Sequence, residues 1–199
     1  ILPFVSGKIN AKNGTSCVSA ECSVSGFASE ALDISSEFPS FSGDSFNSYG
    51  TVLGEGTSNT NVFGYINAQS GITSFSSNYS TYYMNGMTIS SGASIDLKPG
   101  TYYIQYLNIN AADSANDIGI NVVGTGTVYL YVSNLNINRN RVINGLTDTA
   151  VLNIIAYQYV NFNSDSQGEG ILYSLATATF NSGSVFTGSV SAQNVTLNS

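Results

Sequence analysis

A short pattern of alternating apolar and polar residues recurs along the second half of the chain. Its clearest copies are Leu107–Asn110, Leu135–Asn138 and Val160–Asn163. In each copy the two apolar side chains fall on one face of a β-strand, because side chains alternate between the faces of a strand. Weaker copies of the pattern begin at Met87, Ala178 and Val195.

The spacing of these copies predicts how the strands are arranged. Turn-forming residues separate the copies, which begin about 17 to 28 residues apart. A half-buried strand that returns at such intervals is typical of the stacked coils of a β-solenoid. We therefore predict an all-β fold, a right-handed parallel β-helix with about 17 to 28 residues in each coil.

The early coils contain two further apolar strands each, which predicts a triangular cross-section. In one coil, Ile95–Leu97 and Thr101–Ile104 lie on either side of a Lys-Pro-Gly turn. In the next coil, residues 118–122 and 127–132 alternate in the same way. The side chains that we expect to point inward from the third strand of these coils are Tyr102, Ile104, Tyr106, Val128, Leu130 and Val132.

The fourth position of the repeat is asparagine in five of its six copies. Stacked from coil to coil, these amides would form a hydrogen-bonded ladder, since each amide both donates and accepts. A corner that needs turn-compatible residues explains them without a ligand, and direct ligand contact is the alternative. The asparagines are Asn110, Asn138, Asn163, Asn181 and Asn198.

The repeat is not clear in residues 1–86, for which we expect a cap or irregular coils, joined in one domain to the coils of residues 87–199. Gly64–Ala68 resembles Gly7–Ala11, which suggests that coils extend into this half. Ser29–Phe38 precedes a proline and is the segment that favours a short helix. A solenoid needs its ends covered, and a group of aromatic side chains is expected either to plug an open end or to lie across a side of the solenoid. These are Phe38, Phe41, Phe46 and Tyr49.

The composition narrows the class of protein. Charged residues make up 9% of the chain, against roughly 25% in ordinary globular domains. A surface of Ser, Thr, Asn and Tyr is typical of secreted repetitive β proteins, so we expect an extracellular or cell-surface location. The net charge of −7 with five basic residues argues against a nucleic-acid partner. The absence of histidine removes the commonest general base and metal ligand.

Two further features concern the compartment. Cys17 and Cys22 lie in a Ser/Gly-rich segment and are expected to form a disulfide that closes a small loop. The chain has no run of about 18 apolar residues, so we expect no transmembrane segment.

Acidic side chains are the candidates for chemistry in this sequence. Asp113, Asp165 and Glu169 would approach one another if the corners of the coils superpose, and they are candidates for a calcium site. Solvated turn residues are the alternative interpretation. Glycan-cleaving β-helix enzymes need several carboxylates, usually with a basic residue. Arg139 and Arg141 have no acidic partner in the same segment of the sequence. We therefore expect no catalytic residues and no cofactor other than calcium.

Tyrosines of the third strand are candidates for ligand binding. Aligning the coils by this strand places Tyr103 and Tyr129 at equivalent outward positions, with Tyr131 beside them. Outward tyrosines on a flat sheet can stack on sugar rings or bury against a protein. Stacking between strands that only stabilises the sheet is the alternative.

The order of these segments resembles a known type of bacterial surface protein. Ile95–Tyr103 followed by Leu107–Asn110, and then Thr127–Val132 before Leu135–Ile137, is similar to the MshQ-like proteins associated with mannose-sensitive haemagglutinin pili. The resemblance covers about residues 87–145. It implies a β-helix module of a Gram-negative surface or pilus that takes part in attachment, and it carries over no catalytic residues.

These observations lead to three hypotheses. The first is a non-enzymatic adhesin or pilus-tip module that presents a surface to a glycan or protein receptor, with pilus subunits as further partners. The second is a carbohydrate-active β-helix enzyme, a polysaccharide lyase or hydrolase. The third is an ice-binding solenoid, for which Thr88, Thr179 and Thr196 align, although Asn108, Asn136 and Asn161 interrupt them.

Overall fold

The structure is a computed structural model, and it describes residues 3–10, 23–26, 41–55, 60–147 and 149–198. Within these residues every regular element is a β-strand. The described residues contain no helix that is long and apolar enough to span a membrane. The strands are β1 (Pro3–Asn10), β2 (Ser23–Gly26), β3 (Phe46–Ser48), β4 (Val52–Leu53), β5 (Val62–Ala68), β6 (Gly71–Phe75), β7 (Thr81–Ile89), β8 (Ala93–Leu97), β9 (Gly100–Ile109), β10 (Asp117–Val122), β11 (Gly126–Ile137), β12 (Arg141–Asn144), β13 (Ala150–Phe162), β14 (Gln167–Phe180) and β15 (Val185–Leu197).

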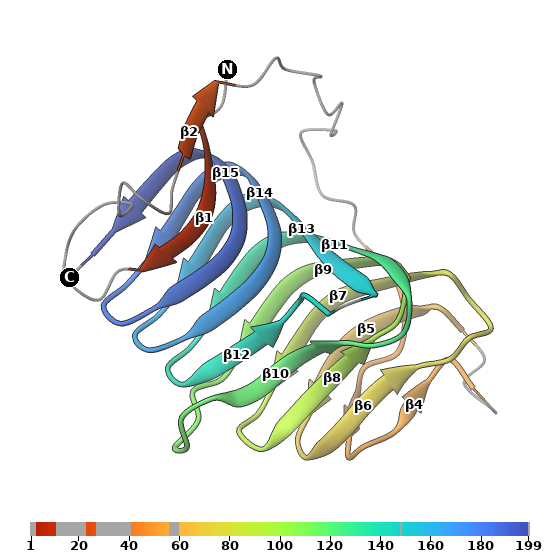
Figure 1. Ribbon diagram of the computed structural model, residues 1–199. Coiled ribbons are helices and arrows are strands. Elements are labelled where there is room, and N and C mark those ends of the chain that lie inside the picture. The colour runs from red at the N-terminus through yellow and green to blue at the C-terminus, as the bar shows by residue number, and fades with distance from the viewer. Residues whose placement is uncertain (1–2, 11–22, 27–40, 56–59, 148, 199) are drawn as a thin grey trace.

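The strands from β3 onward stack in parallel along one axis (Figure 1). One run of paired strands passes through β3, β5, β7, β9, β11, β13, β14 and β15. A second run passes through β4, β6, β8, β10 and β12 and also ends on β14. The chain therefore winds into a parallel β-solenoid, which confirms the fold class predicted from the repeat.

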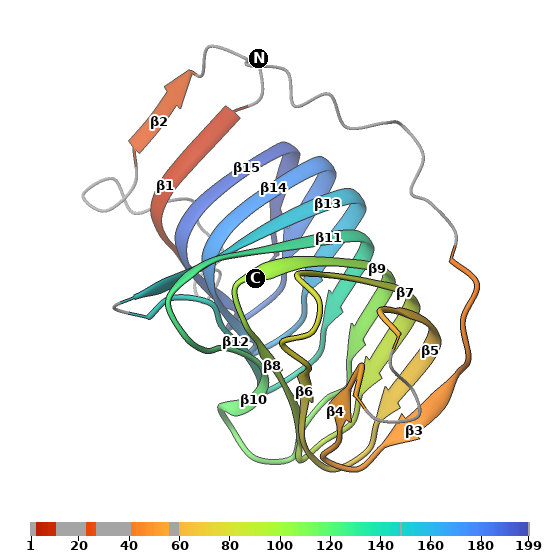
Figure 2. The same ribbon diagram turned by 90° about the vertical axis from the view of Figure 1, so that its right-hand side faces the viewer.

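The long strands bend, as Figure 2 shows, so that each supplies two faces of its coil. In β11 the buried positions are even-numbered up to Val132 and odd-numbered from Leu135, so the alternation changes phase between them. The pairing register of β11 with β13 shifts at the same point. We call the strands before the bend the tyrosine face (residues 81–84, 101–104, 127–132, 150–156 and 171–174) and those after it the asparagine face (residues 66–68, 87–89, 107–109, 135–137, 160–162, 178–180 and 195–197).

The first apolar residue of each repeat lies in a single column. Leu135 pairs with Leu107 on one side and with Val160 on the other, and all three side chains are buried. This arrangement confirms the central prediction of the sequence analysis. The column runs through Phe46, Ile66, Met87, Leu107, Leu135, Val160, Ala178 and Val195.

The interior is packed with aromatic as well as aliphatic side chains. Tyr82 stacks on Tyr102 with ring centroids 5.6 Å apart, and Phe162 stacks on Phe180 at 5.0 Å. The inward side chains predicted from the third strand are buried, with one exception. Tyr106 is exposed, because the bend of β9 changes the phase of the alternation just before it.

The N-terminal strand lies at the far end of the stack. β1 pairs antiparallel with β15, and β2 pairs antiparallel with β1 (Figure 1). Gly64–Ala68 belongs to the parallel stack, whereas Gly7–Asn10 does not. Coils therefore do extend into residues 1–86, as the likeness suggested, although of the two similar segments only Gly64–Ala68 belongs to them.

Regular coils begin at β3, upstream of the boundary at residue 87 that the sequence pattern suggested. Phe46 packs edge-on against Phe63 at this end of the stack, with ring centroids 5.8 Å apart. The helix predicted for Ser29–Phe38 and the disulfide predicted between Cys17 and Cys22 lie outside the described residues.

Replacing Leu135 by alanine should lower the free energy of unfolding by about 2 to 5 kcal/mol, because the cavity would interrupt the packed column. Urea denaturation followed by circular dichroism measures this loss. Tyr129→Ala, on the outside of the same strand, is the control and should cost much less. Equal losses in the two variants would contradict the buried column.

The buried tyrosines predict a decline of stability in alkali. Burial raises the pKa of Tyr102 above its ordinary value of 10.0, although the hydrogen bond to the Lys98 carbonyl opposes this shift. A raised pKa in the folded state leaves stability unchanged below pH 10 and reduces it as the pH rises through the raised value. The urea midpoint should therefore fall above about pH 10. Tyr102→Phe should flatten that fall, and an unchanged slope would contradict the assignment.

Candidate binding surface

The asparagine face presents neutral polar side chains along its whole described length. The middle residue of each strand points outward and pairs in register with the next. None of these outward residues carries a charge. They are Asn67, Thr88, Asn108, Asn136, Asn161, Thr179 and Thr196.

Side-chain amides join the coils at the edge of this face. Nδ2 of Asn163 donates to Oδ1 of Asn138 at 3.0 Å, and Nδ2 of Asn181 donates to Oδ1 of Asn163 at 3.0 Å. The ladder continues from Asn198 to Asn181 at 2.8 Å. Nδ2 of Asn138 also donates to Oδ1 of Asn108, in the adjacent outward column, at 3.2 Å. The asparagine ladder predicted from the repeat is therefore confirmed from Asn138 to Asn198. Asn110 instead accepts from Nδ2 of Asn108 at 2.6 Å.

A second column, of larger side chains, borders the asparagine face at the bend. Tyr65, Tyr106 and Tyr159, which we call the edge tyrosines, are 57%, 45% and 44% exposed. Gly86 lies between the first two and Asn134 between the last two in the register of the sheet. The edge tyrosines therefore recur at every second coil.

The edge tyrosines were not predicted as a group, although the sequence contains a signal for them. Each one directly precedes the first apolar residue of a repeat, as in Tyr106-Leu107 and Tyr159-Val160. Residues in this position form one column, because each lies one residue before a buried column residue that pairs in register with the next coil. Reading the residue before every repeat would have found them.

On the tyrosine face, the pairing register of β9 with β11 differs from the predicted one. Tyr103 pairs with Tyr131, whereas Tyr129 lies opposite Thr101. The prediction aligned the strands from their starts, but the register follows from counting back from the leucine of each repeat. The equivalence of Tyr103 with Tyr129 was therefore wrong.

Tyr103 is held between two other rings of the tyrosine face. Its ring centroid lies 4.8 Å from that of Tyr131 and 5.3 Å from that of Tyr83, in stacked geometry. Phe41 packs on the same group, 5.1 Å from the ring of Tyr83. Burial raises the pKa of Tyr103, and the neighbours Tyr131 and Tyr83 raise it further. Stacking between strands thus occupies both sides of Tyr103, whereas Tyr129 is 43% exposed.

The candidate calcium ligands do not form a cluster. No group of three or more acidic, histidine or cysteine side chains that could hold a metal ion occurs in the described part of the chain. Asp113 and Asp165 lie in corners separated by the corner of an intermediate coil, so their backbones are roughly 10 Å apart. Glu169 lies further along, within β14, where it pairs with Thr187. The corners of successive coils do stack, but their stacking does not gather these three carboxylates into a group that could hold a metal ion.

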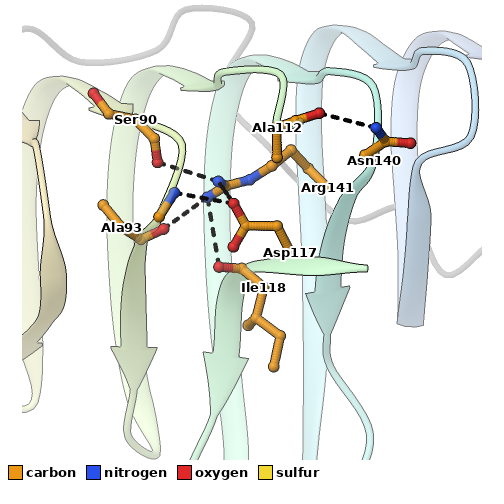
Figure 3. A network of polar contacts seen from close by, with 8 residues as sticks. Ser90, Ala93, Ala112, Asp117, Ile118, Asn140 and Arg141 are labelled. Atoms are coloured by element: carbon orange, nitrogen blue, oxygen red, sulfur yellow. Dashed lines mark hydrogen bonds and ion pairs between the residues drawn. The ribbon is translucent and has the colours of Figure 1, made fainter. Parts of the chain in front are cut away.

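Arg141, for which the sequence showed no partner, is buried in a polar network (Figure 3). Its Nη1 lies 2.6 Å from Oδ2 of Asp117 and donates to the carbonyl of Ser90 at 3.1 Å. Its Nη2 donates to the carbonyl of Ala93 at 2.7 Å. Oδ2 of Asp117 also accepts from the backbone N–H of Gly92 at 3.0 Å.

This network joins three successive coils at the corner between the asparagine face and the third face, which β6, β8, β10 and β12 form (Figure 3). Burial lowers the pKa of Arg141, and the charge of Asp117 opposes that shift. The guanidinium has no exposed surface with which to act on a ligand. We therefore assign Arg141 and Asp117 a structural role.

Comparisons of this chain with protein-family models, with curated proteins and with solved structures found no match. The function must therefore be inferred from the surfaces of the solenoid.

Replacing Asp117 by asparagine should lower the free energy of unfolding by about 3 kcal/mol, because it leaves the buried guanidinium of Arg141 without a counter-charge. Chemical denaturation measures the effect. Asp113→Asn, an exposed change in the loop just before β10, is the matched control and should be nearly neutral. If Asp117→Asn lowers the free energy of unfolding by less than about 1 kcal/mol, the network does not stabilise this corner.

Proposed function

We propose that this chain is a non-enzymatic attachment module, an adhesin that acts outside the cell or on its surface. The observation that carries the proposal is the asparagine face, a regular array of uncharged amide and hydroxyl side chains bordered by the amide ladder. The low content of charged residues and the resemblance to MshQ-like pilus-associated proteins support the same role. The receptor is a surface glycan or a protein, and pilus subunits are further candidate partners.

The mechanism is presentation of a rigid surface. Each amide of the ladder has two N–H donors and two acceptor positions on oxygen, and the bonds between coils use only part of them. The remaining groups can bond to hydroxyls or amides of a ligand. Because the ladder already fixes their orientation, binding costs little side-chain entropy.

Ice binding is a second candidate that the same face supports. Thr88, Thr179 and Thr196 lie in one outward column, with asparagine at the three positions between Thr88 and Thr179. The column repeats at the spacing of stacked strands, about 4.8 Å. Thermal hysteresis of the purified chain would favour this candidate over attachment.

Wild-type protein should bind to ligands on a combined glycan and protein array and should release no new reducing ends from them. Paired substitutions Asn161→Asp and Thr179→Asp place negative charge on the asparagine face and should weaken binding about tenfold or more. Asn153→Asp, on the outward side of the tyrosine face, is the control and should bind as wild type does. Release of reducing ends would support the enzyme hypothesis instead, and the absence of any array ligand would contradict an attachment role.

A further inference from the structure

The edge tyrosines have a regular spacing along the axis of the solenoid. Adjacent coils are about 4.8 Å apart, so residues that recur at every second coil lie about 9.5 Å apart. Tyr65, Tyr106 and Tyr159 follow this spacing, with Gly86 and Asn134 between them. The three tyrosines thus form a line of about 19 Å, parallel to the axis.

The residues between the edge tyrosines leave room for the rings. A β-carbon at Gly86 would lie 2.6 Å from two ring atoms of Tyr65, so the Tyr65 ring lies directly over Gly86. Asn134 is buried between Tyr106 and Tyr159. This alternation of large and small residues keeps the tyrosines apart, whereas Tyr83, Tyr103 and Tyr131 on the tyrosine face stack ring on ring.

The surface next to the edge tyrosines is uncharged. The outward column of the asparagine face contains only asparagine and threonine, and the chain as a whole has a net charge of −7. A polyanionic ligand would meet repulsion and no basic partner on this column. A ligand rich in hydroxyls and without charge fits both the amides and the exposed rings.

We propose that the edge tyrosines bind an uncharged, extended β-1,4-linked polysaccharide that runs parallel to the solenoid axis. In such a chain successive sugar rings are turned by about half a revolution, so every second ring presents the same face. A repeat of two sugars therefore matches a repeat of two coils. Alternate sugars stack on Tyr65, Tyr106 and Tyr159, while their hydroxyls bond to the asparagine face. This inference rests on the proposed attachment function and names the class of ligand and its direction.

The test uses the whole chain and two uncharged probes, cellulose and chitin, together with their soluble oligosaccharides. Affinity should rise with oligosaccharide length up to about five sugars, the length that reaches all three rings, and then level off. Dextran, with a different linkage, and carboxymethyl-cellulose, with negative charge, should bind at least about tenfold more weakly. Equal binding of all four polymers, or affinity that is independent of length, would overturn the proposal.

Substitutions distinguish an effect of losing a ring contact from an effect of losing the fold. Tyr106→Ala should weaken binding of the five-sugar ligand about tenfold, and Tyr106→Phe should retain it, because the ring and not the hydroxyl makes the stacking contact. Tyr129→Ala removes a tyrosine of similar exposure from the tyrosine face and should have no effect. Urea denaturation shows whether each variant is folded.

The outcomes also distinguish this inference from the proposed function. If the wild type binds array ligands, and this binding is lost in the Asn161→Asp/Thr179→Asp variant but not in Tyr106→Ala, the attachment function stands and the role of the edge tyrosines is wrong. Binding of a protein ligand alone would likewise agree with the attachment function and contradict polysaccharide binding by the edge tyrosines. If no ligand of any class binds, both proposals fail.

Discussion

The structure depends on parallel, in-register pairing of successive coils. Because each strand pairs residue by residue with the strand of the next coil, equivalent residues form columns along the axis. Every column must then consist of side chains that tolerate copies of themselves or of similar residues as neighbours. Leucine, valine and methionine meet this condition in the interior, and asparagine meets it outside, where each amide donates to the next. An uncompensated charge in such a column would repel its own neighbours, which accounts for the low content of charged residues.

The corners are where the coils differ from one another, and the exceptions to the repeat lie there. Asn116, Asn140 and Asp165 have positive φ angles at these turns, a conformation that asparagine and aspartate tolerate better than most residues. The ion pair of buried Arg141 with partly exposed Asp117 also lies at a corner, where the backbone carbonyls of Ser90 and Ala93 accept from the guanidinium. Variation in coil length is thus absorbed without disturbing the columns of the faces.

The same regularity gives the solenoid its proposed function. A surface that repeats along an axis can recognise a ligand that also repeats, because each additional coil adds an equivalent contact. The asparagine face and the edge tyrosines border one another, so amide groups and exposed rings face the same side of the molecule. On the tyrosine face, both sides of the Tyr103 ring already stack on Tyr83 and Tyr131, so this ring is not open to a ligand in the same way.

The amino-acid sequence by itself determined the parallel solenoid, the buried column of Leu107, Leu135 and Val160, and the asparagine ladder. These features follow from a short local pattern that recurs about every 17 to 28 residues, so strand alternation and the spacing of the copies are enough to read them. The register of the tyrosines, the partner of Arg141 and the pairing of β1 with β15 depend on contacts between residues far apart in the chain. Only the tertiary structure decided them, because bends and corners of different length set which residues of neighbouring coils meet.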